Sequence, residues 1–178
     1  MDWKIASLCL ACLLGAAGVQ AENAPAKPQK ATTRYEDKQW LYSFQPPLGW
    51  KPVPAKDLPK PMVGFSGPNE NGFAVNCVVN FHTVAVKAGQ EEKFVESVKQ
   101  EYKKYGTLSE MKRFRHQGNL AFGWRTVLSG LNKGLENRQV VFFFERRAYE
   151  LTFTLPTANR KKYEPVFDKI VASFRFGK

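Results

Sequence analysis

The chain has 178 residues, of which 43% are apolar and 13% aromatic, and 27 Lys and Arg against 16 Asp and Glu give it a formal net charge of +11. This length and composition suffice for one domain with its own core, and we expect no second domain. The positive charge favours anionic partners such as phospholipid headgroups, acidic polysaccharide or an acidic protein face. A surface that is simply solvated is the alternative interpretation.

The first 21 residues have the pattern of an export signal. Lys4 precedes an apolar run from Ile5 to Val19, and Val19-Gln20-Ala21 is a small-x-small site of the kind that signal peptidase cuts. A membrane-spanning helix needs about 20 apolar residues, more than this run supplies. We therefore expect residues 1–21 to be a signal peptide, and the mature protein to be periplasmic or else secreted. Specific nucleic-acid binding is the least expected role in that location.

Cleavage after Ala21 would leave Cys77 as the only cysteine. The mature protein could then form no intramolecular disulfide, and its fold would depend on its core. Residues 22–34 are rich in Ala, Pro, Lys and Thr without apolar periodicity, which predicts a flexible leader. The folded domain is expected over residues 35–178.

The N-terminal half of the domain reads as strands followed by a helix. Trp40, Tyr42 and Phe44 alternate with polar residues and predict a strand. Residues 62–66 and 73–84 predict two strands joined by residues 67–72, where Asn-Gly supplies the turn. The odd positions from 73 to 81 are apolar, so Cys77 is expected in the core. Residues 90–105 predict an amphipathic helix, with Gly106 as its left-handed cap.

The C-terminal half predicts an antiparallel meander and a last helix. A short basic strand over 111–116 is followed by strands over about 120–129, 136–145 and 148–155, joined by tight turns. Residues 140–144 are apolar on both alternating faces, which indicates a strand covered on both sides. The last helix is predicted over 164–173, because Pro165 is expected only in a first helical turn. The fold class is therefore α+β, with an antiparallel sheet flanked by helices on both faces.

Three features of the sequence resemble the PsbP-like family, which includes the photosystem II extrinsic protein PsbP and bacterial periplasmic DcrB-like proteins. The first is a strand running into a Pro-Gly-Trp turn over 42–50, and the second is the run 149–154 followed by Tyr163 and Ser173-Phe174. The third is the order of hairpin, long strand, helix and meander. The resemblance implies an α/β/α sandwich and a non-catalytic accessory or binding role, with the bacterial envelope proteins as the nearer comparison.

Standard catalytic motifs do not occur in this sequence. It has no G-x-S-x-G, H-E-x-x-H, Walker A or G-x-G-x-x-G pattern, and we expect no enzyme. An unrecognised hydrolase remains the third hypothesis, with Ser66, His82, His116 or Cys77 as its candidate residues. Two histidines and one thiol expected in the core argue against a tight metal site, and no cofactor is predicted.

The leading hypothesis is an exported accessory protein that docks on an envelope protein or an anionic membrane surface through basic residues. The runner-up is a small-ligand-binding periplasmic domain, with Asn76, Asn80 and His82 as a polar spot on the sheet. Hydrogen bonds from these side chains to neighbouring loops are the alternative interpretation. The basic clusters at 146–147 and 160–162 are expected at opposite ends of the sheet, and the start of the last helix is a possible anion site. The candidate anion- or partner-binding residues are Lys112, Arg113, Arg115, Arg146, Arg147, Arg160, Lys161 and Lys162.

Overall fold

The computed structural model describes residues 33–177, so the predicted signal peptide and most of the predicted leader lie outside the described residues. An 8-stranded antiparallel sheet has the order β3-β4-β5-β10-β9-β8-β6, with β7 paired to β8, and a 3-stranded sheet has the order β1-β2-β11. The large sheet consists of β3 (Lys51–Pro52), β4 (Val63–Glu70), β5 (Phe73–His82), β6 (Gly106–Leu108), β7 (Lys112–His116), β8 (Asn119–Leu128), β9 (Leu135–Phe144) and β10 (Arg147–Pro156). The small sheet consists of β1 (Tyr35–Asp37), β2 (Tyr42–Phe44) and β11 (Arg175–Phe176). The helices are α1 (Glu91–Lys103) and α2 (Arg160–Ser173), with short 3-10 helices at Ala55–Asp57, Gly130–Asn132 and Thr157–Asn159.

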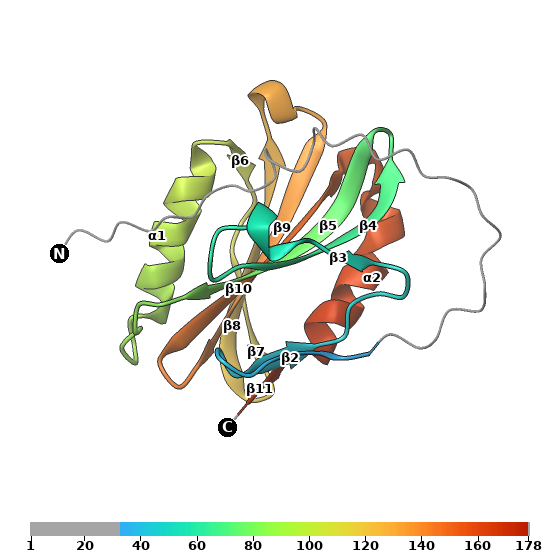
Figure 1. Ribbon diagram of the computed structural model, residues 1–178. Helices are drawn as coiled ribbons and strands as arrows, with labels where there is room; N and C mark the ends of the chain where they lie inside the picture. The colour runs from blue at the N-terminus through green and yellow to red at the C-terminus, as the bar shows by residue number, and fades with distance from the viewer. Residues whose placement is uncertain (1–32, 178) are drawn as a thin grey trace.

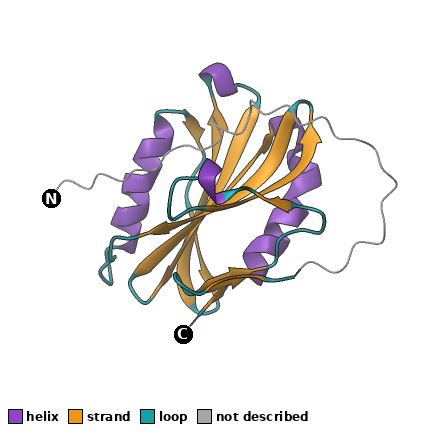
Figure 2. Cartoon of the chain, in the orientation of Figure 1, coloured by secondary structure: helices purple, strands orange, loops and turns teal. Residues whose placement is uncertain are grey.

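The two long helices lie on opposite faces of the large sheet (Figure 1), and strands make up most of the layer between them (Figure 2). One core contains Phe167 and Ile170 of α2 together with the small sheet, and the other contains Phe94 and Val98 of α1. The large sheet therefore buries apolar side chains on both faces. The predicted fold class, an antiparallel sheet flanked by helices on both faces, is confirmed.

Alternation along β5 and β9 explains this double burial. The odd residues of β5 face α2, and Cys77 among them is only 1% exposed. In β9, Phe142 packs in the α2 core whereas Val141 and Phe143 pack in the α1 core. Because side chains of a strand alternate between faces, an apolar run of this kind needs a layer on each side.

The first hairpin is longer than the sequence predicts. β4 continues to Glu70, so that only Asn71 and Gly72 form the turn, and a register shift lies between Ser66 and Asn69. The bulge accounts for the difference, because it admits an extra residue into the ladder where Gly and Pro suggest a loop. Gly67 lies so close to the Trp50 ring that a Cβ there would be 2.5 Å from it.

The last helix begins earlier than predicted, and the placement of Pro165 in its first turn is wrong. α2 starts at Arg160, and Pro165 lies inside it with its side chain exposed. Proline removes one ladder hydrogen bond at this point. Burial of Tyr163 and the contacts of Arg160 with Glu136 hold the first turn in place and offset that loss.

The end of α1 also differs from the prediction. Gly106 is not a left-handed cap but the first residue of β6, a three-residue strand that the sequence does not reveal. A Cβ at Gly106 would lie 2.0 Å from the main-chain oxygen of Val127. Glycine is required here by the close approach of β6 to β8.

Candidate functional site

The α1 face of the sheet carries a buried polar group around the Glu150 carboxylate. Glu150 is 1% exposed. Its Oε2 atom lies 2.9 Å from His82 Nε2, and the Tyr102 hydroxyl donates to Oε1 at 2.7 Å and lies 3.1 Å from the Thr152 hydroxyl. Asn80 lies directly across from Glu150 in the β5–β10 register. Of the three residues of the predicted ligand spot, His82 therefore contacts this carboxylate and Asn80 lies on the neighbouring strand beside it.

Asn76, the third residue of that spot, lies elsewhere. It is six positions from His82 on β5, about 20 Å along an extended strand. Its side-chain amide donates to the Ala74 carbonyl at 3.1 Å. The register places it in a polar row that crosses five strands and comprises Ser66, Asn76, Thr154, Asn137 and Thr126.

Sequence reasoning missed most of this buried polar face. Gln139 and Thr126 hydrogen-bond to each other, with Gln139 Nε2 3.1 Å from Thr126 Oγ1. Next to them, Trp124 is 3% exposed and its indole N–H has no hydrogen-bond partner within residues 33–177. The only sequence signal was polar residues at alternate positions of strands with apolar opposite faces. That pattern is also typical of a solvated face.

The cations at the start of α2 are bound to carboxylates. Arg160 Nε donates to both oxygens of Glu136, at 2.9 and 2.8 Å, and Arg125 Nη1 contacts the same carboxylate at 3.0 Å. Glu136 is fully buried, and its hydrogen bonds raise the pKa of the Arg160 guanidinium. Lys162 is paired with Glu70, while Lys161 is exposed. Arg160 is therefore committed to Glu136, not open to an external anion.

The cations of β7 have no such partners. Lys112, Arg113 and Arg115 are exposed, and none forms an ion pair with a carboxylate in the part of the chain that the structure describes. The pairing of β7 with β8 places Lys112 across from Gly123 and Phe114 across from Ala121, on the α2 face. Arg113 and Arg115 therefore project on the α1 face. β7 pairs with no other described strand, so its outer edge is a sheet edge.

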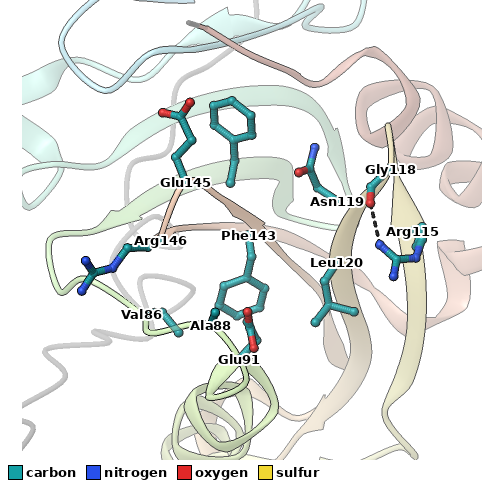
Figure 3. Close-up of a pocket in the computed structure, with 11 residues that line it drawn as sticks. Val86, Ala88, Glu91, Arg115, Gly118, Asn119, Leu120, Phe143, Glu145 and Arg146 are labelled. Carbon is teal, nitrogen blue, oxygen red and sulfur yellow. Dashed lines mark hydrogen bonds between the residues drawn. The ribbon is translucent and has the colours of Figure 1, made fainter.

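A hollow of about 240 Å³ lies on the α1 face beside the β7–β8 turn. Arg115 and Arg146 lie on opposite sides of it, with Leu120 and Phe143 between them (Figure 3). The Arg115 guanidinium donates to the Gly118 carbonyl at 2.6 Å. Two of the basic clusters are therefore brought to one hollow, whose lining also includes the carboxylates Glu91 and Glu145.

The remaining candidate, Arg147, lies on the opposite face from this hollow. It occupies an odd position of β10 and interacts with Tyr149, which belongs to the α2 core. The whole length of β10, from Arg147 to Pro156, separates residues 146–147 from residues 160–162. The two clusters lie at opposite ends of the sheet.

A second hollow, of about 590 Å³, lies between β7 and α2. Phe114, Gly123, Val140 and Val171 form its apolar part, and Lys112, Arg125, Arg138 and Glu164 are among its charged residues. Glu164 pairs with both Arg125 and Arg138. Arg113 also lines the hollow, and it and Lys112 are the two lining cations without an ion pair to a carboxylate within residues 33–177.

The candidate residues of a hydrolase do not come together. Ser66 lies across from Asn76, about 20 Å along β5 from His82, and four strands separate β4 from the strand that carries His116. Burial raises the pKa of the Cys77 thiol.

Over residues 33–177, no three His, Cys, Asp or Glu side chains are grouped so that they could hold a metal ion. No helix in this range is long and apolar enough to cross a membrane.

A protein-family model described as PsbP matches residues 30–176, which is almost the whole described chain. The chain belongs to the PsbP family. The resemblance seen in the sequence is thereby confirmed. No protein with a curated description matches this chain.

Solved structures share this PsbP fold at low sequence identity. A cyanobacterial PsbP from Synechocystis sp. PCC 6803 is 16% identical, with a TM-score of 0.59 over 86% of this chain and 98% of its own. LpqN, described as involved in cell envelope biogenesis of Mycobacterium tuberculosis, is 12% identical, with a TM-score of 0.56 over 82% of this chain and 90% of its own. The Ran-binding protein Mog1p of Saccharomyces cerevisiae is 10% identical, with a TM-score of 0.52 over 84% and 96%.

Proposed function

We propose that this PsbP-family chain is an exported, non-catalytic accessory protein of the cell envelope, which docks on a protein or an anionic membrane surface through its basic residues. The observation that carries this proposal is the cluster of Lys112, Arg113 and Arg115. These residues are exposed on a sheet edge and form no ion pair with a carboxylate within residues 33–177. Unpaired cations on an edge attract anionic partners and accelerate their association. Other cations, such as Arg160 and Lys162, are neutralised within the fold.

The comparisons support an accessory role in general terms. One structural neighbour is described as a Ran-binding protein and another as involved in cell envelope biogenesis. The first description supports binding as a role that this fold can serve, and the second supports a place in the cell envelope. The residues of this chain are consistent with that, because its serine, histidine and thiol candidates are far apart or buried.

Neutralisation of the β7 cations tests the docking surface. The variant carries Lys112→Gln, Arg113→Gln and Arg115→Gln, and the matched control carries Lys56→Gln, Lys133→Gln and Lys169→Gln. Both variants lose three positive charges from exposed residues. We expect only the β7 variant to lose salt-sensitive retention on phosphatidylglycerol vesicles or on envelope extract from the source organism. Equal retention of the two variants would contradict docking through β7.

Export is part of the same proposal and has its own test. If residues 1–21 are a signal peptide, the purified mature protein begins at Glu22. N-terminal sequencing of the protein from its native cells measures this directly. A protein that retains Met1, or that fractionates with the cytoplasm, would contradict export without affecting the docking surface.

A small-ligand role is the second candidate, and Trp124 is the observation that favours it. Its buried indole N–H has no partner within residues 33–177, and a buried donor in that state costs free energy unless a ligand or water accepts from it. A ligand acceptor would raise the melting temperature of the native protein. The shift should be smaller in Trp124→Phe, which keeps an aromatic ring but lacks the donor. A panel of metabolites that gives no shift in either protein would count against this role.

A further inference from the structure

The outer edge of β7 has main-chain groups that are open to a further strand. The β7–β8 turn consists of Gln117 and Gly118, whose φ angles of 51° and 78° are those of a two-residue type I′ hairpin. In such a hairpin the closing pair, His116 and Asn119, exchanges both hydrogen bonds, and bonded and non-bonded pairs alternate from there. Arg113 and Arg115 belong to the non-bonded pairs. Their main-chain N–H and C=O groups therefore point away from β8.

No described segment takes up these groups. β7 has β8 as its single strand partner among residues 33–177, and no main-chain hydrogen bond links Arg113 or Arg115 to another described loop. An exposed edge of this kind is a template for an added strand. Basic side chains protect such an edge from a second basic copy, but they do not protect it from an acidic chain.

The two faces of β7 differ in chemistry, and this difference limits what an added strand could be. On the α2 face, the hollow of about 590 Å³ presents Phe114, Val140 and Val171 beside Lys112. The register places the exposed residues Arg113 and Arg115 on the α1 face, and Arg113 also contributes to the lining of that hollow. Acidic groups near the edge are Glu110 and Glu164 on the α2 face, of which Glu164 is already paired with two arginines. On the α1 face, Glu91 and Glu145 line the same hollow as Arg115, but neither forms an ion pair with it.

We propose that β7 binds an extended acidic segment of a partner protein as an added strand, with acidic side chains toward Arg113 and Arg115 and apolar side chains toward the hollow beside Lys112. This inference rests on the proposed docking function and names the partner chemistry. Main-chain hydrogen bonds to Arg113 and Arg115 give affinity in this mode, and alternate side chains give specificity. A partner segment of this kind has acidic and apolar residues at alternate positions of its sequence.

Three synthetic peptides test the proposal on the purified protein. The first consists of alternating Glu and Val residues. The second peptide has the same composition with its Glu and Val residues in separate blocks, which keeps the charge and removes the alternation. The third is the alternating peptide with N-methyl groups on the edge-facing amides. We expect the alternating peptide to bind about tenfold more tightly than either of the others, because each control loses edge hydrogen bonds or side-chain placement.

Two variants of one residue separate the main-chain contribution from the charge. Arg113→Gln removes the guanidinium and keeps the outward N–H, whereas Arg113→Pro removes both without disturbing the bonds of β7 to β8. Binding of the alternating peptide should weaken further, about tenfold, from the Gln to the Pro variant. Hydrogen exchange of the Arg113 and Arg115 amides should slow when the peptide binds. Circular dichroism of both variants verifies that the fold is retained.

Equal binding of the alternating and blocked peptides, or no effect of N-methylation, would overturn strand addition while leaving charge-driven docking intact. Failure of every peptide to bind at low salt would also overturn strand addition. Docking itself is judged separately, by retention of the β7 charge variant on vesicles and envelope extract. The two proposals can therefore fail independently.

Discussion

Glu136 determines how much of the basic surface is available for partners. Its carboxylate is fully buried on the α2 face, where Arg125 and Arg160 both contact it. A buried carboxylate without cations would be strongly unfavourable, so these two arginines are required by the fold. Their positive charge is neutralised by Glu136 within the fold. The cationic residues of β7 face no buried carboxylate, so their charge remains available to bind an anionic partner.

Replacement of Glu136 by Gln should therefore be strongly destabilising. The variant keeps the shape of the side chain but leaves two guanidinium groups beside a neutral amide, and the expected loss is about 3 kcal/mol. Urea unfolding measures it as a lower midpoint. Asp168→Asn is the matched control, because Asp168 pairs with Arg138 from a side chain that is 59% exposed. We expect that control to lose less than about 1 kcal/mol, and similar losses for both variants would contradict the role of burial.

Residue-level prediction from the sequence succeeded where one strand alone carried the signal. Alternation in β5 correctly placed Cys77 in the core and Asn76, Asn80 and His82 on the opposite face. It could not reveal Glu150 as the partner of His82, because the two residues are 68 positions apart and meet only through strand register. Contacts between distant strands leave no local pattern in a single sequence.

Among the elements, the β4–β5 hairpin is tied to the start of α2 through Glu70. Its carboxylate accepts from the Tyr163 hydroxyl at 2.6 Å and from the Asn159 amide at 3.0 Å, and it pairs with Lys162. The hydrogen bond from Lys162, followed by that from Tyr163, lowers the pKa of Glu70 below its usual value of 4.5. Burial and the Glu70 carboxylate raise the pKa of Tyr163.

The lowered pKa of Glu70 predicts an acid-dependent part of the stability. As pH falls, the unfolded chain takes up this proton first, so the contribution is complete well above pH 4.5 and is lost as pH falls through the lower folded-state pKa. Urea midpoints of Glu70→Gln should therefore lie below those of the native protein at neutral pH, and the difference should shrink in acid. Glu110→Gln, at an exposed residue, serves as the control. A difference that is constant with pH would contradict this assignment.

Element-level prediction failed mainly where backbone proximity, not composition, determines the structure. The main strands and both helices follow from periodicity, which reports burial of one face. The sequence did not predict β6, because a strand of three residues shows no periodicity. Gly106 was interpreted as a helix cap, but it is the point where β6 approaches Val127 closely. The early start of α2 depends on Arg160 reaching Glu136, a contact that is 24 positions away in sequence.

At the level of the whole molecule, the small sheet brings the two ends of the described chain together. β11 near the C-terminus pairs with β2, which in turn pairs with β1. Arg34 strengthens this junction: its guanidinium donates to the Ser173 carbonyl at 3.1 and 2.7 Å and to the Ser43 hydroxyl at 3.2 Å. The sequence predicts Arg34 to end a flexible leader, but these contacts make it part of the folded domain. The error arises because an isolated arginine beside Pro, Lys and Thr gives no sign of its distant acceptor.

Arg34→Ala should therefore loosen the junction between the chain ends and destabilise the whole domain. Charged donors to a main-chain carbonyl are worth more than neutral ones, and partial exposure reduces the effect, so we expect a loss of about 1–2 kcal/mol. Urea unfolding measures the loss, and native-state hydrogen exchange should accelerate first at Arg175 and Phe176, which pair with β2. Lys38→Ala removes an exposed cation nearby and should change neither measurement. Equal behaviour of the two variants would mean that Arg34 contributes only charge, and that the folded domain begins at β1.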